Sequence, residues 1–182
     1  GWLLITRFPF NLFSKNYFLK HRKNNEEFQS LSTAEASRKS SKPKFIYTHF
    51  YMPHPPYFYD KNGRLKDQTI VFQEYKTNPP ASYLEYVTYC NSKIRELIDT
   101  IQKNSPQAVI LIMSDHGYRE AKSQKTKYFF QNMNAAYFPD HKYDKFYDSV
   151  SGVNEFRIVL NKYFNAGFPL LADSTVLLID KK

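Results

Sequence analysis

Apolar and polar positions divide the chain into a few predicted elements. The strongest apolar run is Ala108–Met113, which lies between Pro106 and Gly117. A short run of this kind, bounded by turn residues, predicts a strand that is buried on both faces. Phe45–Phe50 is aromatic and β-branched and predicts an earlier strand. Shorter strands are expected at Met133–Phe138 and Thr175–Ile179.

Two segments have the spacing of amphipathic helices. In residues 82–103, Ser82 and Glu85 have the spacing of a capping box, and Asn104–Pro106 stops the pattern. Apolar residues recur there at three- and four-residue steps and predict one buried stripe: Leu84, Val87, Ile94, Leu97, Ile98 and Ile101. Cys90 lies near this stripe, so we expect it in the core.

Val153–Phe164 predicts a second helix, which closes near Gly167. Its apolar residues share one face: Val153, Phe156, Leu160 and Tyr163. Residues 58–80 are polar and predict a long loop with a turn at Asn62–Gly63. Residues 1–41 are expected to form an N-terminal arm and a basic connector, followed by an α/β region over 42–182.

The order of strand, helix and strand over residues 45–113 is that of a βαβ unit, whose two strands are parallel. We therefore predict an α/β fold with a parallel or mostly parallel sheet and flanking helices. In such folds, ligands bind beyond the carboxyl ends of the strands. Loops that follow parallel strands open at the same edge of the sheet, so the residues after Phe50 and after Met113 are expected to converge.

Candidate chemistry is present in both loops. Asp115 and His116 follow the second strand, and a carboxylate beside an imidazole can form half of a divalent metal site; Asp115 could equally cap the next turn. His49 and His54 lie in a turn stiffened by Pro53, Pro55 and Pro56. Arg119 is within reach of the same edge and is either an anion ligand or a surface arginine. Asp140–His141 repeats the dipeptide without a buried run before it and is interpreted as a surface loop.

Composition narrows the classes of partner. The 182 residues carry a formal net charge of +9, which suits phosphate esters, nucleic acid or an acidic membrane surface, although a Lys-, Asn-, Tyr- and Phe-rich composition also arises from codon bias. A single cysteine excludes an internal disulfide and a Cys-rich zinc site. No apolar run approaches the ~20 residues that span a bilayer.

Two motifs together resemble a known family. T-H-F-Y-M-P-H-P-P-Y at 48–57 and I-M-S-D-H-G-Y-R at 112–119 are similar to segments of bacterial sulfatase-like proteins of the alkaline phosphatase superfamily. That group includes sulfatases and phosphoethanolamine or phosphoglycerol transferases. The resemblance covers Lys42 to about Ala172 and matches the C-terminal part of those proteins; V-N-E-F-R-I-V-L-N-K-Y-F-N at 153–165 is similar to their closing segment.

The resemblance implies roles for these residues. Asp115 and His116 match a pair that binds a divalent metal, with Zn²⁺ or Mn²⁺ expected, and His49 and His54 match histidines near the phosphoryl or sulfuryl group or a second metal. Attack by a metal-activated Thr or Ser is the implied chemistry. Residues 1–41 contain no segment that matches the nucleophile, so we expect the metal-binding, C-terminal part of a larger hydrolase or transferase, or a degenerate relative, inactive alone.

The expected substrate is a phosphate or sulfate ester, including lipid or glycan headgroups, and the resemblance places relatives outside the cytoplasmic membrane. The alternative is a non-enzymatic basic module that binds nucleic acid or an anionic surface. Residues 14–44, which contain Lys20–Lys23, support that alternative by charge, but a solvated helix face explains them as well. No sequence motif specific to nucleic-acid binding supports it.

Overall fold

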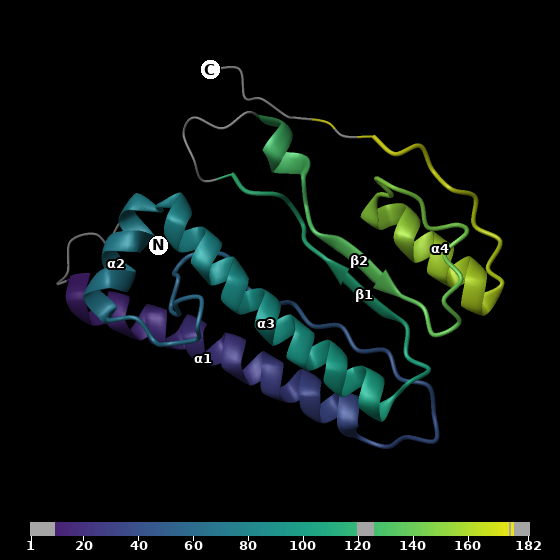
Figure 1. Cartoon of the computed structure of the whole chain (residues 1–182), viewed down its shortest axis with the longest axis horizontal. Helices are drawn as coiled ribbons and strands as arrows, with labels where there is room; N and C mark the ends of the chain where they lie inside the picture. Colours follow the sequence, from purple (N-terminus) through teal and green to yellow (C-terminus); the bar gives the residue numbers. More distant parts are fainter. Residues whose placement is uncertain (1–9, 120–125, 175, 177–182) are drawn as a thin grey trace. The chain divides into compact units, whose positions relative to one another are not determined.

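The computed structural model of the chain describes residues 10–119, 126–174 and 176. The chain divides into two compact units, Gly1–Pro106 and Gln107–Lys182. Figure 1 traces the elements of each unit along the sequence. None of the helices in the described ranges is long and apolar enough to cross a membrane.

Three helices build the first unit: α1 (Phe10–Ser37), α2 (Gln68–Thr77) and α3 (Pro80–Asn104). Helices α1 and α3 pack along one another (Figure 1). Among the α1 residues whose burial the structure describes, 17–37, the buried ones are Asn25, Ser32 and Ala36, which are small or polar. Most of the stretch expected to be an arm and connector is therefore helical, and the boundary at residues 41 and 42 stays a prediction.

The core of the first unit is a cluster of aromatic residues on α3 and the loop before α2. Its buried members are Tyr57, Tyr86, Tyr89 and Cys90. The rings of Tyr86 and Tyr89 stack with centroids 5.9 Å apart. The prediction that Cys90 lies in the core is confirmed, and burial raises the pKa of its thiol to about 12.

The predicted helix over 82–103 is confirmed, but its start and its buried face differ from the prediction. The helix begins at Pro80, and Ser82 does not cap it; the Ser82 hydroxyl donates to Glu74 Oε1 at 2.6 Å. Glu74 lies on α2, a helix within the predicted loop, so that part of the loop prediction was wrong. Leu84, expected in the buried stripe, is 63% exposed because tyrosines occupy the inner face.

Phe45–Phe50 forms no strand, which corrects the prediction of a βαβ unit. The segment instead contacts α1 through side chains. The Thr48 and Ser32 hydroxyls lie 2.8 Å apart, and the backbone N–H of Tyr51 donates to Asn25 Oδ1 at 3.3 Å. Aromatic and β-branched residues favour a strand only where a neighbouring strand offers its edge, and in the structure this segment borders a helix.

The second unit contains β1 (Ile110–Met113), β2 (Asn134–Tyr137), the 3₁₀ helix η2 (Thr126–Phe130) and α4 (Gly152–Phe164). The strands predicted near 108–113 and 133–138 are thus confirmed, but the first is not buried on both faces as predicted: none of its residues is fully buried, and Met113 is 41% exposed. They pair with each other in antiparallel fashion, with Met113 opposite Asn134. The fold is mixed α/β, and the described residues contain no parallel pair. The strand predicted at Thr175–Ile179 falls almost wholly outside the described residues; Val176, which is described, lies in no strand.

The predicted helix over 153–164 is confirmed as α4, but the face expected to be apolar is largely exposed. Val153 is 59% exposed and Phe156 is 42% exposed, whereas Asn154 and Glu155 are fully buried. The helix ends at Phe164, and its C-cap residue Asn165, whose φ of 51° is left-handed, lies two residues before the predicted Gly167.

Polar contacts of α4 hold the segment that follows it. The Asn154 amide donates to Leu171 O at 2.8 Å and accepts from Leu171 N at 2.9 Å. Asn161 exchanges a similar pair of bonds with Phe168, both at 2.7 Å. Residues 168–173, here called the C-terminal strap, are therefore fixed along α4, because both ends of the strap are hydrogen-bonded to one helix face.

Glu155 makes the second unit sensitive to pH. Burial raises the pKa of its carboxyl from 4.5 to about 7, and the Asn134 amide lowers it by a smaller amount. That amide donates to Val150 O at 3.1 Å, and neither Glu155 oxygen has a hydrogen-bond partner of normal geometry among the described residues. Between about pH 4.5 and 7 the unfolded chain loses this proton first, so stability falls as the pH rises.

We therefore expect Glu155→Gln to raise the free energy of unfolding by on the order of 2 kcal/mol at pH 8 and to change it little at pH 4. Urea denaturation at both pH values measures this difference. Glu96→Gln is the control, because the Glu96 side chain is 58% exposed and should show no such pH dependence. A Glu155→Gln protein that loses stability equally at both pH values would contradict the prediction.

Candidate functional site

The Asp115–His116 turn leaves the end of β1 and is anchored on both sides. Before it, the backbone N–H of Ser114 donates to Met133 O at 2.9 Å. After it, the N–H of Gly117 donates to Phe129 O at 2.8 Å. Asp115 and His116 therefore lie between two backbone hydrogen bonds, both of which are made to the segment 129–133.

The hydrogen bonding of His116 determines which ring nitrogen is available. Its Nδ1 lies 2.6 Å from Gly117 O. A carbonyl oxygen only accepts, so Nδ1 carries the proton, and Nε2 of the neutral ring keeps its lone pair. Nε2 lies 3.7 Å from Asp115 Oδ2. The Asp115 side chain is 84% exposed and that of His116 is 29% exposed, so both potential metal-binding groups are accessible.

The positions of His116 Nε2 and Asp115 Oδ2 are compatible with binding to one divalent ion. Ligand atoms bound about 2.0–2.1 Å from a tetrahedral zinc ion lie about 3.3 Å apart, and the observed 3.7 Å between Nε2 and Oδ2 is close to that separation. The backbone bond to Nδ1 is the usual way in which proteins orient a ligating histidine. Across the ranges that the structure describes, no group of three or more metal-ligating side chains gathers. The turn therefore offers two candidate ligands, and no third metal-ligating side chain joins them in the described residues.

Arg119 follows the turn in the second unit. Its side chain is exposed. A guanidinium keeps its charge at any working pH and can bind a phosphate or sulfate group with two parallel hydrogen bonds. The position therefore suits either of the roles expected from the sequence.

His54 and His49 lie in the first unit. Nδ1 of His54 lies 2.8 Å from Pro55 O, so this ring also keeps Nε2 available by the same argument as for His116. Its ring contacts Tyr51, with centroids 4.6 Å apart. His49 is exposed on the segment that runs beside α1. The expected convergence of these histidines with Asp115 and His116 stays a prediction, because the two pairs belong to different units.

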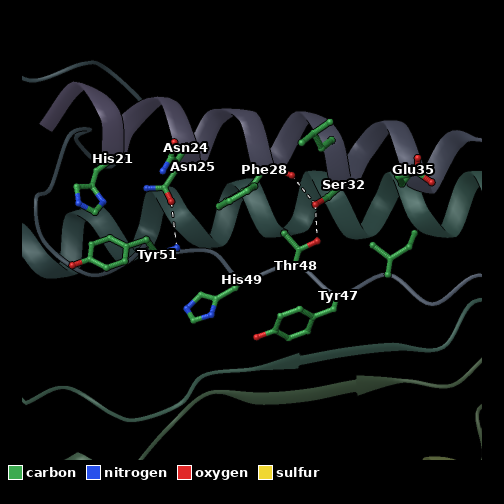
Figure 2. Close-up of a pocket in the computed structure, with 12 residues that line it drawn as sticks. His21, Asn24, Asn25, Phe28, Ser32, Glu35, Tyr47, Thr48, His49 and Tyr51 are labelled. Atoms are coloured by element: carbon green, nitrogen blue, oxygen red, sulfur yellow. Dashed lines mark hydrogen bonds between the residues drawn. The ribbon is translucent and has the colours of Figure 1, made fainter. Parts of the chain in front are cut away.

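A groove of about 550 Å³ runs between α1 and residues 46–51. Figure 2 shows Thr48 pointing toward α1, whereas the rings of Tyr47 and His49 point away from the helix. The lining combines aromatic rings with neutral amides and hydroxyls, and its members are His21, Asn24, Asn25, Phe28, Leu31, Ser32, Glu35, Ile46, Tyr47, Thr48, His49 and Tyr51. His49 is the predicted site residue that this groove contains.

His21 is a residue that the sequence did not single out as part of a site. Its ring lies 4.7 Å from that of Tyr51 by centroids, on the side of Tyr51 that α1 covers (Figure 2). Burial lowers the pKa of His21, and electrostatic interactions with His54 and Lys20 lower it further. The helical spacing of Tyr17, His21 and Asn25 is a signal that could have placed it on the inner face of α1.

The comparison with protein families identifies the family to which the chain belongs. The family model described as Sulfatase matches residues 14–157, which is well over half of the sequence. The chain belongs to the sulfatase family. This confirms the coarser part of the resemblance, the alkaline phosphatase/sulfatase superfamily. Neither the curated proteins nor the solved structures with which the chain was compared contain a match to it.

The second Asp-His dipeptide of the chain is a surface pair, as predicted. Asp140 pairs with Lys162, with Oδ2 and Nζ 2.9 Å apart, and this bond lowers the pKa of the carboxyl. His141 is exposed and has a φ of 54°. Because Asp140 is neutralised by a lysine, the pair lacks the open arrangement of Asp115 and His116.

Gly117 closes the Asp115–His116 turn because no larger residue fits. A Cβ at this position would lie 2.0 Å from Tyr128 O and 2.6 Å from Gln131 O. Both atoms are backbone oxygens, so relief of the clash requires the chain to move. Gly117 is therefore a requirement for the close approach between the turn and residues 128–131.

We expect Gly117→Ala to lower the free energy of unfolding by about 1–3 kcal/mol and to expose the amides of the turn. Hydrogen exchange followed by mass spectrometry over peptides that cover 112–119 measures the second effect. Gly167→Ala is the control: its φ of 68° makes the change costly, but nothing lies within 4 Å of the added Cβ, so protection at 112–119 should not change. Equal exchange in the two variants would contradict the prediction.

Proposed function

We propose that this chain provides the metal-binding part of a sulfatase-like hydrolase or phosphoryl-headgroup transferase. The observation that carries the proposal is the Asp115–His116 turn, in which a carboxylate oxygen and an imidazole nitrogen with a lone pair lie 3.7 Å apart on an exposed surface. Asp115 and His116 are assigned as ligands of one divalent ion, Zn²⁺ or Mn²⁺. Sulfatases generally use divalent metals, which supports this assignment.

The remaining site residues are assigned to the ester or a second metal. Arg119 offers a permanent positive charge to a phosphate or sulfate group. His54 offers Nε2, held by the bond from Nδ1 to Pro55 O, and His49 offers an exposed imidazole. A bound metal ion would supply positive charge that stabilises the ester oxygen as its negative charge develops. No nucleophile is assigned to this chain.

The more specific sequence predictions belong to the same proposal. The motif pattern favours a phosphoethanolamine- or phosphoglycerol-transferase-like protein that acts on lipid or glycan headgroups outside the cytoplasmic membrane. In this proposal the residues from about 42 onward correspond to the C-terminal part of such an enzyme, and a segment other than those described here supplies the nucleophile.

Metal titration tests the proposed ligands. The 182-residue chain, stripped with a chelator, is titrated with Zn²⁺ and with Mn²⁺ by isothermal calorimetry. We expect one ion per chain, bound with modest affinity because the described site has two protein ligands. Asp115→Asn and His116→Ala should each weaken binding more than tenfold, since each removes half of the ligand set.

The chain contains its own matched control. Asp140→Asn and His141→Ala alter the other Asp-His dipeptide, which the structure shows paired with Lys162, and should leave the affinity unchanged. No binding by the wild-type chain, or equal losses from both dipeptides, would contradict the proposal that Asp115 and His116 hold the ion.

Anion binding tests the role of Arg119. Equilibrium dialysis of labelled phosphate and labelled sulfate against the Mn²⁺-loaded chain measures the affinity. We expect Arg119→Ala to weaken binding of both anions by about tenfold or more, because a hydrogen bond to a charged group is worth about 1.5–3 kcal/mol.

Arg95→Ala is the matched control. Arg95 is exposed on α3, and its substitution removes the same charge at another position. An equal loss from Arg95→Ala would show that net charge, not a site, attracts the anions. That result would favour the alternative of a basic binding module. Binding that falls steeply with salt in every variant would point the same way.

A further inference from the structure

The antiparallel ladder between β1 and β2 stops at a specific residue pair. Met113 and Asn134 are the last partners in register. The next pair along the ladder is Ser114 and Met133, and the N–H of Ser114 still donates to Met133 O at 2.9 Å. In a continuing ladder the N–H of Met133 would donate back to Ser114 O. The structure shows a different arrangement.

Two side chains replace that return bond. The N–H of Met133 donates to the Ser114 hydroxyl at 2.7 Å. The Ser114 carbonyl accepts from the Asn132 amide, with Nδ2 and O 2.8 Å apart. The Ser114 hydroxyl therefore lies between the two backbones. The carbonyl oxygen of Ser114 bonds the Asn132 side chain instead of the Met133 N–H. The two segments separate at this point, and the chain turns into Asp115 and His116.

We propose that Ser114 and Asn132 are positioning residues for the metal ligands Asp115 and His116. The inference rests on the proposed metal role of the turn. The exposed carboxyl of Asp115 has no packing to fix its direction, so the backbone anchors on either side of the pair set the 3.7 Å between Oδ2 and Nε2. Without the hydroxyl, the Met133 N–H can reach Ser114 O, the ladder extends by one bond, and the Asp115 side chain is re-aimed.

Metal affinity of paired variants tests this inference. Ser114→Ala removes the hydroxyl acceptor, and Asn132→Ala removes the amide donor. We expect each to weaken Zn²⁺ and Co²⁺ binding by about 10- to 100-fold, the range seen when a group that orients a metal ligand is lost. Ser114→Thr keeps the hydroxyl and should restore the affinity. The absorption spectrum of bound Co²⁺ should change in both alanine variants and return in the threonine variant.

Controls separate positioning from folding. Ser174→Ala and Asn91→Ala make the same chemical changes at exposed positions and should leave affinity and spectrum unchanged. Asn132 is itself exposed, so its alanine variant is expected to fold even if Ser114→Ala does not. Hydrogen exchange at the Met133 amide gives a readout without metal: protection should persist in Ser114→Ala, because a backbone acceptor replaces the hydroxyl.

The outcomes distinguish this inference from the function on which it rests. Wild-type chain that binds no metal contradicts the proposed function and the positioning role together. Wild-type binding that Ser114→Ala and Asn132→Ala leave unchanged contradicts the positioning role alone. An affinity loss in Ser114→Ala that Ser114→Thr does not reverse also contradicts it, because the hydroxyl would then not be the cause.

Discussion

The antiparallel pairing of β1 with β2 is the interaction on which the Asp115–His116 turn depends. Its register sets Met113 opposite Asn134 and brings residues 128–133 alongside the turn. Since side chains alternate between the faces of a strand, a shift of one residue would move every β1 side chain to the other face. The same register brings α4 into place, because the Met113 methyl group meets Gly152 and Asn134 donates to Val150 O.

Local hydrogen bonds orient the two candidate histidines, His54 and His116, in the same way. In His54 and in His116, Nδ1 bonds the carbonyl of the next residue, at 2.8 Å and 2.6 Å. This contact needs no distant partner, so it forms wherever the loop backbone has the right shape. The proline-rich turn provides this backbone shape for His54, and the turn closed by Gly117 provides it for His116. His21 differs, because its ring lies against Tyr17 and Tyr51 and burial disfavours its charged form.

Local periodicity predicted those elements whose pattern is strong within a single segment. The helices at 80–104 and 152–164, both strands of the hairpin and the turn at Asp115–His116 follow from short-range spacing. For α1 the sequence indicated only a solvated helix face around Lys20–Lys23, because the buried residues Asn25, Ser32 and Ala36 give no apolar stripe. The parallel pairing predicted for Phe45–Phe50 failed because a strand needs a partner that its own side chains cannot specify. The metal assignment rests on a local motif, and nothing in a linear sequence indicates that Ser114 would end the ladder.

Polar contacts contribute to the orientation of α4. The helix exposes Val153 and Phe156 yet buries Asn154 and Glu155 completely. A buried amide costs free energy unless it is hydrogen-bonded, and Asn154 meets this condition through Leu171, Tyr147 and Asp173.

Asp173 in turn accepts from the Ser151 backbone N–H at 2.9 Å, beside the start of α4. The Ser151 and Tyr147 hydroxyls hold the pKa of its carboxyl at about 2, so it stays charged. The strap therefore fixes the start of α4, Gly152 meets Met113, and Met113 immediately precedes Ser114. A continuous set of contacts within one unit thus links a C-terminal segment, which has no candidate chemistry of its own, to the turn that carries the proposed metal ligands.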